Sequence, residues 1–232
     1  MADWKQISGA LTRISAGSRT NVWGVNSAGN IYRYTNNDAS PWVQIPGALV
    51  DIGAGADGTV WGVNAGGDIY RYTGDESGGH WKQISGSLTA ISAGSRTNVW
   101  GVNSAGNIYR YTNNDASPWV QIPGALVDIG AGADGTVWGV NAGGDIYRYT
   151  GDESGGHWKQ ISGSLTAISA GSRTNVWGVN SADNIYRYTN NDASPWVQIP
   201  GALVDIGAGA DGTVWGVNAA GNIYRYTGDQ PG

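Results

Sequence analysis

Short apolar runs alternate with turn residues along the whole chain. Within residues 11–47, four segments rich in β-branched and aromatic residues are separated by Gly, Pro, Asn and Asp: 11–16, 21–26, 31–35 and 42–45. Such segments predict β-strands, and the residues between them predict tight connections. No apolar stripe with the helical period of 3.6 residues is found, so we expect no helices.

This four-strand pattern recurs six times, with a period of 38 or 39 residues. A tryptophan opens each unit and a second lies 19 residues further on, and these two series contain all 12 tryptophans. All 12 tyrosines fall in six copies of Ile-Tyr-Arg-Tyr, from residues 31–34 to 223–226. Four antiparallel strands repeated six times predict an all-β, six-bladed β-propeller that forms a single domain over residues 1–232.

The two ends of the chain predict how the ring closes. Residues 4–7 form a Trp-Lys-Gln-Ile strand with no unit before it, and the chain stops at residues 228–232, where a seventh Trp-x-Gln-Ile would come. We therefore expect the N-terminal strand to complete the last blade. Closure in this way removes the exposed edge that an open sheet would present.

The middle hairpin of each unit also suggests a register. A two- or four-residue turn around residues 28–29 would pair Trp23 with Tyr34 and Gly24 with Arg33. Since side chains alternate across a strand, the two aromatic residues would share one face and the arginine would lie beside a glycine on the other. A three-residue turn would shift the pairing and break this arrangement.

Composition excludes several classes of function. Charged residues make up only 13% of the chain, the net charge is −5, and no basic stripe occurs, so we expect no nucleic-acid partner. No run of 18 apolar residues is present, so we expect no membrane insertion. The absence of cysteine excludes disulfides and thiolate ligands. The N-terminal residues lack a secretory pattern, which together with the missing cysteines predicts a cytoplasmic location.

Candidates for catalysis and metal binding are few. Ser77, Asp75 and His80 could be combined into a triad on paper, but a solvated loop between blades explains them more simply. Residues 36–38 and 56–58 offer oxygen ligands of the kind that Ca²⁺ prefers. They lack alternating carboxylates, and Asx turns account for them. We therefore predict no enzyme activity, no cofactor and no metal site.

Side chains that recur in every unit are the candidates for recognition. The arginine of Ile-Tyr-Arg-Tyr is the charged residue present in all six units. Its guanidinium could serve purely to support the fold by lying on a tryptophan ring. Alternatively, Arg and Asn could donate hydrogen bonds in a shallow pocket between blades, where a tryptophan face stacks on a sugar ring. The predicted carbohydrate-binding residues are Trp23, Asn26, Arg33, Trp42, Trp61, Asn64, Arg71, Trp81, Trp100, Asn103, Arg110, Trp119, Trp138, Asn141, Arg148, Trp158, Trp177, Asn180, Arg187, Trp196, Trp215, Asn218 and Arg225.

The units alternate between two types. Odd units carry Ser-Arg-Thr-Asn at residues 18–21, whereas even units carry Ala-Asp-Gly-Thr at residues 56–59. Ligands bound between blades would therefore meet two kinds of interface, each in three copies. The number of sites could be three or six, and repeated weak sites would gain affinity for a repetitive surface through multivalency.

Four motifs together resemble the tectonin repeat over essentially the whole chain: Trp-x-Gln-Ile-x-Gly-x-Leu, Ile-x-Ala-Gly, Val-Trp-Gly-Val-Asn and Ile-Tyr-Arg-Tyr. The Asn-Asn-Asp-Ala-Ser-Pro-Trp segment is most similar to fungal tectonins, which are related to fish-egg lectins and a tachylectin. This resemblance implies a defence lectin that recognises O-methylated sugars on bacterial and nematode glycans. Small apolar floors at residues 28–29 and at Gly24 would suit a methyl ether, because a hydroxyl would be left unsatisfied there.

A different class of function also fits the sequence. The first two 77-residue units differ only at Ala10/Ser87 and Arg13/Ala90, which indicates either recent duplication or deliberate symmetrisation. The alternative to a lectin is a propeller that binds proteins, or an engineered symmetric scaffold. Homo-oligomerisation is compatible with either interpretation.

Overall fold

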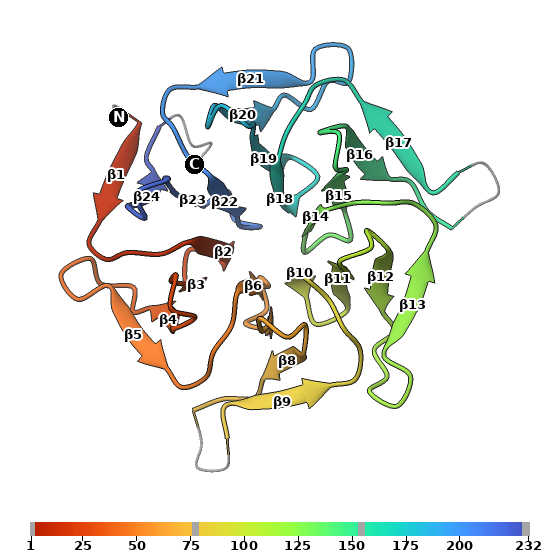
Figure 1. The fold of residues 1–232 in the computed structure, drawn as a ribbon. Coiled ribbons are helices and arrows are strands. Elements are labelled where there is room, and N and C mark those ends of the chain that lie inside the picture. The colour runs from red at the N-terminus through yellow and green to blue at the C-terminus, as the bar shows by residue number, and fades with distance from the viewer. Residues whose placement is uncertain (1–2, 76–78, 153–155, 229–232) are drawn as a thin grey trace.

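The computed structural model describes residues 3–75, 79–152 and 156–228, which form six four-stranded antiparallel sheets around a central axis (Figure 1). The three odd blades are β2(Arg13–Ser18), β3(Asn21–Val25), β4(Ile31–Tyr34), β5(Trp42–Ile45); β10(Ala90–Ser95), β11(Asn98–Val102), β12(Ile108–Tyr111), β13(Trp119–Ile122); and β18(Ala167–Ser172), β19(Asn175–Val179), β20(Ile185–Tyr188), β21(Trp196–Ile199). The even blades are β6(Asp51–Ala54), β7(Val60–Val63), β8(Ile69–Tyr72), β9(Trp81–Ile84); β14(Asp128–Ala131), β15(Val137–Val140), β16(Ile146–Tyr149), β17(Trp158–Ile161); and β22(Asp205–Ala208), β23(Val214–Val217), β24(Ile223–Tyr226), β1(Trp4–Ile7). The predicted six-bladed fold is confirmed.

The N-terminal strand closes the ring, as expected. Strand β1 is the outermost strand of the sixth blade and pairs with β24 from Trp4 opposite Tyr226 to Ile7 opposite Ile223. Strands β1 and β24, the first and the last strand in the sequence, lie side by side in Figure 1. The indole of Trp4 also donates to the Pro200 carbonyl of the preceding blade, at 3.0 Å. The last blade is therefore assembled from both ends of the chain.

The predicted register of the middle hairpin is wrong by one residue. Trp23 lies opposite Arg33, and Gly24 lies opposite Tyr32. The cause is a three-residue turn: the amide of Asn26 donates to the carbonyl of Asn30, at 3.0 Å. Within this turn Gly29 has a φ of 82°, a left-handed conformation that glycine adopts at little cost. The arginine therefore shares a face with the tryptophan, and its carbon Cζ lies 5.5 Å from the centre of that ring.

The core lies between blades rather than within them. The buried residues Trp23, Val25 and Ile31 of the first blade pack against Ile52 and Val60 of the second, and five equivalent clusters complete the ring. The six tryptophans on the second strand of each blade, such as Trp23 in β3, are at most 1% exposed. Burial of apolar surface of this size is the main favourable contribution to folding.

The innermost strands approach each other so closely that glycine is required. A Cβ atom placed on Gly17 would lie 2.1 Å from the carbonyl of Gly55 in the next blade. The gap at Gly24 is already filled, because a Cβ there would lie 2.4 Å from the side chain of Leu11. The expected methyl-sized floor at Gly24 is thus occupied by the protein itself.

Within the described residues every regular element is a strand, and no helix is long and apolar enough to cross a membrane.

Candidate functional site between blades

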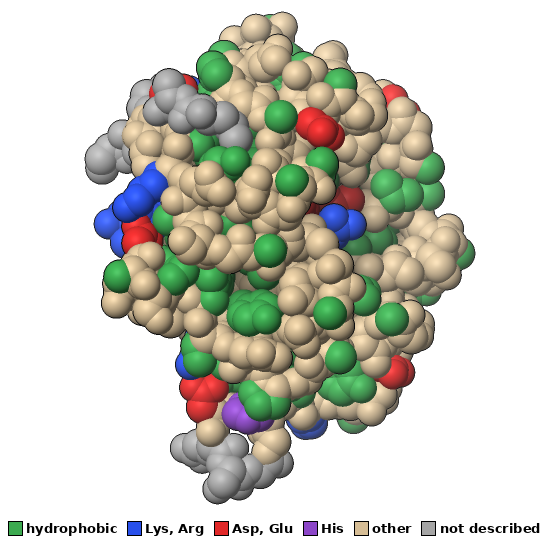
Figure 2. Space-filling view, turned by 60° about the vertical axis from the view of Figure 1, so that its left-hand side comes forward, with side chains coloured by type: hydrophobic (Ala, Val, Ile, Leu, Met, Phe, Trp, Pro, Cys, Tyr) green, Lys and Arg blue, Asp and Glu red, His purple; other side chains and the backbone are tan. Residues whose placement is uncertain are grey.

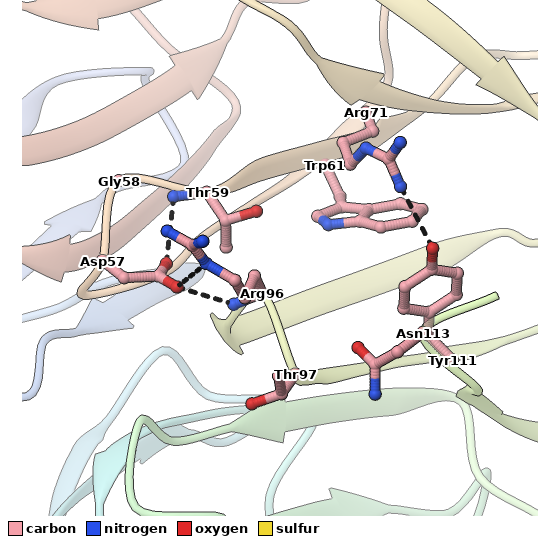
Figure 3. A pocket seen from close by; sticks show the side chains of 9 residues that line it. All are labelled: Asp57, Gly58, Thr59, Trp61, Arg71, Arg96, Thr97, Tyr111 and Asn113. Carbon is pink, nitrogen blue, oxygen red and sulfur yellow. Dashed lines mark hydrogen bonds and ion pairs between the residues drawn. The ribbon is translucent and has the colours of Figure 1, made fainter. Parts of the chain in front are cut away.

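Two kinds of interface alternate around the ring. At an even-to-odd interface, an even blade is followed by an odd one; at an odd-to-even interface the order is reversed. A pocket of about 550 Å³ lies at the even-to-odd interface between the second and third blades (Figure 3). Its lining comes from both blades and consists of Asp57, Gly58, Thr59, Trp61, Arg71, Arg96, Thr97, Tyr111 and Asn113. Repetition of the sequence places the same residue types, including the tyrosine and the asparagine, at the other two even-to-odd interfaces.

Trp61 is one of the residues that line this pocket, although its side chain is fully buried, and its indole N–H has no hydrogen-bond partner among the described residues. The Nε1 atom is buried, as are those of the equivalent Trp138 and Trp215, which also lack partners in the described part of the chain. In Figure 3 this nitrogen is on the side of the ring that faces Thr59 and Arg96. A buried donor without a partner is costly and calls for a structural or functional explanation.

The odd blades satisfy the corresponding indole. Trp23 Nε1 donates to Asn21 Oδ1 at 2.8 Å, and the Nδ2 atom of the same asparagine donates to the Gly55 carbonyl in the next blade, at 2.7 Å. Asn98 and Asn175 make the same two bonds at the other odd-to-even interfaces. The asparagine thus bridges the interface at the position that threonine occupies in even blades.

Each even-blade arginine joins two neighbouring blades. Arg71 lies over the Trp61 ring, with Cζ 5.3 Å from its centre, and donates to both carboxylate oxygens of Asp115 at 2.9 Å. It also donates to the Tyr111 hydroxyl at 3.1 Å. Hydrogen bonds from Arg71 and Lys82 hold the pKa of Asp115 well below its usual range. Arg148 and Arg225 make the same bidentate contacts to Asp192 and Asp38.

The odd-blade arginine has a weaker set of contacts. Arg33 donates to the Asp75 carboxylate with a single nitrogen at 2.8 Å and to the Tyr72 hydroxyl at 3.2 Å. The Asp75 side chain is 53% exposed, compared with 29% for Asp115. Burial and the hydrogen bond to Asp75 raise the pKa of Tyr72 to about 12. The two kinds of interface therefore differ in the strength of their polar contacts as well as in the asparagine bridge.

An ion pair between Asp57 and Arg96 forms part of the rim of the pocket. Asp57 Oδ2 accepts hydrogen bonds from the backbone amide and from Nε of Arg96, at 2.9 and 3.2 Å. These bonds hold the pKa of Asp57 below its ordinary value against the opposing effect of burial. On the facing wall, Asn113 has a φ of 63°, in the left-handed region where asparagine is tolerated better than most residues. Its equivalents in the other odd blades, Asn36 and Asn190, have the same conformation.

Of the residues predicted for recognition, the structure brings Trp61 and Arg71 into this pocket. The predicted asparagines lie elsewhere: Asn64 Oδ1 accepts from the backbone amides of Gly66 and Asp68, which closes the turn between two strands. The tryptophans that open the sequence units lie on the outermost strands of the blades, and their N–H groups donate across blade interfaces. That of Trp81, for example, donates to the Pro46 carbonyl at 2.8 Å. These two sets are explained by structural contacts.

The predicted stacking on a tryptophan face is also restricted. Arg71 covers the Trp61 ring, and Tyr111 packs against it edge-on with ring centres 4.8 Å apart. The pocket therefore offers hydrogen-bond donors more than an open aromatic face. Sequence reasoning missed Asp57, Thr59, Arg96, Thr97, Tyr111 and Asn113; the alternation of residues 18–21 with 56–59 was the signal that pointed to four of these positions.

A second polar feature lies at one mouth of the central channel. Asp51, Asp128 and Asp205 begin the innermost strands of the even blades, and each accepts a hydrogen bond at 2.8 Å from an isoleucine amide of a neighbouring blade. Loss of hydration raises the pKa of Asp51 to about 8 and that of Asp205 to about 7, and also raises that of Asp128. Arg13 lines the same hollow, where the other two odd blades carry Ala90 and Ala167.

Neither catalysis nor metal binding gains support from the described residues. Of the triad written from sequence, Ser77 lies outside them, and His80 Nδ1 is 3.8 Å from Asp75 Oδ1. No group of three or more His, Asp or Glu side chains in the described segments could hold a metal ion. Charged side chains form small separate groups on the face shown in Figure 2, with wide uncharged areas between them.

Comparison with known families agrees with the repeat pattern. The Tectonin domain family matches residues 1–118 and 114–231. The chain belongs to the tectonin family. Propellers of this family are typically non-enzymatic. No curated protein sequence matches the chain.

Solved structures with a similar fold are distant in sequence. The chain resembles the WD40 propeller domain of Doa1 with a TM-score of 0.65 and 9% identity, covering 99% of this chain and 98% of that one. It resembles streptogramin B lyase with a TM-score of 0.64 and 22% identity, covering 93% and 78%. It resembles YCF48 from Cyanidioschyzon merolae with a TM-score of 0.59 and 16% identity, covering 97% of this chain and 85% of that one. At these identities the likeness concerns the propeller fold alone.

Proposed function

We propose that this tectonin propeller is a lectin that binds neutral glycans in the pockets between its blades, without catalysis. The observation that carries the proposal is the buried, unpartnered N–H of Trp61, which lines the pocket together with Arg71, Arg96 and Tyr111. Such a site is rich in hydrogen-bond donors. A ligand that supplies oxygen acceptors and little charge is its natural complement.

O-methylated sugars fit this donor-rich pocket particularly well. A methyl ether oxygen accepts a hydrogen bond but donates none, so it matches donors such as indole and guanidinium groups. Thr59 and Thr97, which line the pocket, each bring a methyl group as well as a hydroxyl. A free hydroxyl in the same place would bury a donor for which few acceptors are vacant, because Asp57 and Asp115 are already bonded to arginines.

Repetition around the ring supports binding to a surface that displays many copies of a glycan. Individually weak sites on one rigid ring raise the overall affinity when several are engaged together. We propose bacterial and nematode glycans as targets, a role in defence, and a cytoplasmic location for the protein before its release.

The proposal is tested with mono-O-methylated methyl glycosides of glucose, mannose, galactose and fucose, each compared with its unmethylated parent. Titration calorimetry and NMR should detect binding of at least one methylated member and a loss of at least tenfold on removal of its methyl group. Equal affinity for the parent sugar would remove the methyl requirement. A complete absence of binding across the panel would contradict the lectin function.

A matched variant locates the binding in the pocket. Replacing Asn36, Asn113 and Asn190 by glycine removes three side chains from the pocket walls, and Gly74 and Gly151 already occupy the corresponding loop position of even blades with a φ of 122°. Stability should therefore be maintained, because glycine accepts the left-handed conformation freely. Glycan affinity should fall, whereas unchanged affinity would place the site elsewhere.

A protein-binding propeller is the second candidate, and exposed valines around the channel mouth favour it. Val50 and Val127 are 44% and 47% exposed beside the three aspartates described above. A protein ligand covering this mouth would bury them. Substitution of both valines by serine would then abolish that binding and leave glycan titrations unchanged.

A further inference from the structure

The mouth of the central channel is a hollow of about 470 Å³ that is lined by residues of all six blades. Strands β6, β14 and β22, the innermost strands of the even blades, surround the axis in Figure 1, and each begins with an aspartate that lines the hollow. These aspartates are Asp51, Asp128 and Asp205. Among the described residues that line the hollow, Arg13 brings the one positive charge. Three ionised carboxylates would therefore outnumber their counter-charge.

Arg13 lies beside one of the three aspartates, and no arginine takes the equivalent place beside the other two. The residue that follows Arg13 donates its amide to Asp205 at 2.8 Å. Attraction to Asp205 is also the main cause that raises the pKa of Arg13. In the other two odd blades the corresponding residue is alanine: Ala90 beside Asp51, and Ala167 beside Asp128. The hollow is thus open on two of its three sides.

The arrangement of the carboxylates suits an extended cation rather than a metal ion. In the described segments no group of three or more acidic or histidine side chains could hold a metal ion. The Oδ2 atom of each aspartate accepts an isoleucine amide at 2.8 Å, which orients the carboxylate. A guanidinium spreads its charge over a planar group with five N–H donors at the end of a long stem. It can therefore bond carboxylates that are too far apart to share one metal ion.

Poor hydration of the carboxylates strengthens their attraction for a cation that enters the hollow. Loss of hydration is the main cause that raises the pKa of Asp51 to about 8, and the negative charges of Asp128 and Asp205 add to this rise. The positive charge of Arg13 acts in the opposite direction. A second cation would relieve the repulsion further, because Coulomb attraction is stronger where water is excluded.

Exposed valines border the same hollow. Val50 and Val127 directly precede two of the aspartates and are 44% and 47% exposed. The other strongly exposed large apolar side chains of the described residues, at positions 43, 120 and 197, lie far from the axis on the outermost strands β5, β13 and β21. Apolar side chains beside a concave charged site favour a protein ligand, whose own apolar residues would cover them.

We propose that the channel mouth is a docking site for a partner protein that inserts an arginine side chain into the hollow. The guanidinium is held by Asp51 and Asp128, on the two sides where alanine stands in place of Arg13. Apolar residues next to the inserted arginine cover the exposed valines. This inference rests on the protein-binding candidate named above and gives it a chemistry. It does not depend on glycan binding between the blades, because the hollow lies on the axis of the ring.

A peptide array tests the preference for arginine. Capped nonapeptides, randomised around a fixed central residue, are probed with the labelled full chain. Peptides with a central arginine and apolar neighbours should be enriched at least tenfold over those with citrulline, the uncharged analogue of arginine. Binding without a preference for arginine would overturn this inference and leave a protein-binding propeller. No binding to any peptide would contradict both, whereas glycan titrations report on the lectin function separately.

The affinity for the best arginine peptide should rise with pH, because the peptide binds the ionised carboxylates. The pKa values of Asp51 and Asp205 are raised to about 8 and about 7, and that of Asp128 is raised as well, so protons are lost in the neutral range. Arg13, the remaining charged group of the hollow, stays protonated throughout. Calorimetry should give at least a fivefold higher affinity at pH 8.5 than at pH 5.5. An affinity independent of pH would overturn the proposed contact.

The two alanines allow a matched pair of variants. Ala90→Arg combined with Ala167→Arg supplies both missing arginines from the chain itself and should weaken peptide binding at least tenfold. The fold should tolerate the change, because the first 77-residue unit carries Arg13 at this position and differs from the second at only one other. Glutamine at both positions is the control, since it adds length without charge, and it should weaken binding less than threefold. An equal loss in both variants would contradict recognition by charge.

Removal of Arg13 provides the opposite test. Arg13→Ala opens the third side of the hollow, beside Asp205, and removes a competing positive charge. The affinity for the arginine peptide should therefore rise at least threefold, and the affinity for its citrulline analogue should not. An unchanged or lower affinity for the arginine peptide, in a variant that circular dichroism shows to be folded, would overturn the inference.

Discussion

The guanidinium of Arg71 reaches from the second blade to the third and donates to both carboxylate oxygens of Asp115, each at 2.9 Å. The same guanidinium covers the Trp61 ring in its own blade. One side chain therefore links the core tryptophan of a blade to the loop of the next. This geometry gives the recurrent arginine a clear structural role, independent of any ligand.

We expect Arg71→Ala to lower the free energy of unfolding by about 1 to 3 kcal/mol, through loss of the cation–π contact and of apolar cover. The Asp115 carboxylate would keep Lys82, at 2.7 Å, as a partner. Arg33→Ala is the matched comparison and should lower the free energy of unfolding less. Arg33 donates only one hydrogen bond to its carboxylate partner, Asp75, and that carboxylate is more exposed than Asp115. Chemical denaturation of both variants measures the difference, and a larger loss for Arg33→Ala would contradict it.

Ring closure should depend on the N-terminal strand. Deletion of residues 1–8 removes all four residue pairs between β1 and β24 and the Trp4 hydrogen bond to Pro200. The exposed edge of β24 should then cause aggregation or a clear fall in melting temperature. Calorimetry and size-exclusion chromatography measure both effects. Deletion of residues 229–232 is the control, and an unchanged melting temperature in the first variant would show that the strand is dispensable.

The contact between innermost strands should tolerate no added methyl group at Gly17. Gly17→Ala would place a carbon 2.1 Å from the Gly55 carbonyl, so the two blades must move apart. We expect a loss of stability of roughly 3 kcal/mol or more, or failure to fold. Gly66→Ala is the control, because the nearest atom would be 3.4 Å away and the sixth blade already has an alanine at this position, Ala220. Similar melting temperatures for both variants would refute this explanation.

Stability should fall as pH rises from about 5 to 8, because of the channel aspartates. The pKa values of Asp51 and Asp205 are raised in the folded state, to about 8 and about 7, so the folded chain binds more protons than the unfolded chain in this range. Their contribution is complete below the unfolded pKa near 4 and is lost as pH rises through the folded values, at up to about 1.4 kcal/mol per pH unit for one proton. Asp51→Asn should flatten this dependence in denaturation curves recorded at pH 5, 6.5 and 8.

The charged neighbours of these aspartates provide a second arm of that test. Asp51 faces Asp128, Asp205 and Arg13, and the positive charge of Arg13 opposes the rise in its pKa. Arg13→Ala reproduces the alanine of the other odd blades and should reduce stability more at pH 8 than at pH 5. An equal loss at both values would indicate that Arg13 contributes through packing rather than charge.

The strand order, the number of blades and the mode of closure follow from the sequence alone. Each unit carries its own turn residues and its own pair of tryptophans. The Trp-Lys-Gln-Ile strand at residues 4–7 precedes the first complete unit, and the last unit lacks the equivalent strand, so the two complement each other. These features are local or strictly periodic, so they can be recognised without knowledge of distant contacts. The recurrent arginines and core tryptophans were identified in this way.

The register and the site were decided by tertiary structure. A difference of one residue in the turn after Asn26 moved Arg33 from a glycine to the ring of Trp23, and sequence alone allowed either turn. The partner of Arg71, Asp115, lies 44 residues away in another blade. The pocket combines two blades, and its key feature is an indole without a partner, which exists only once the blades have packed. Such features depend on the relative placement of side chains distant in sequence, and this placement is established by packing of the whole ring.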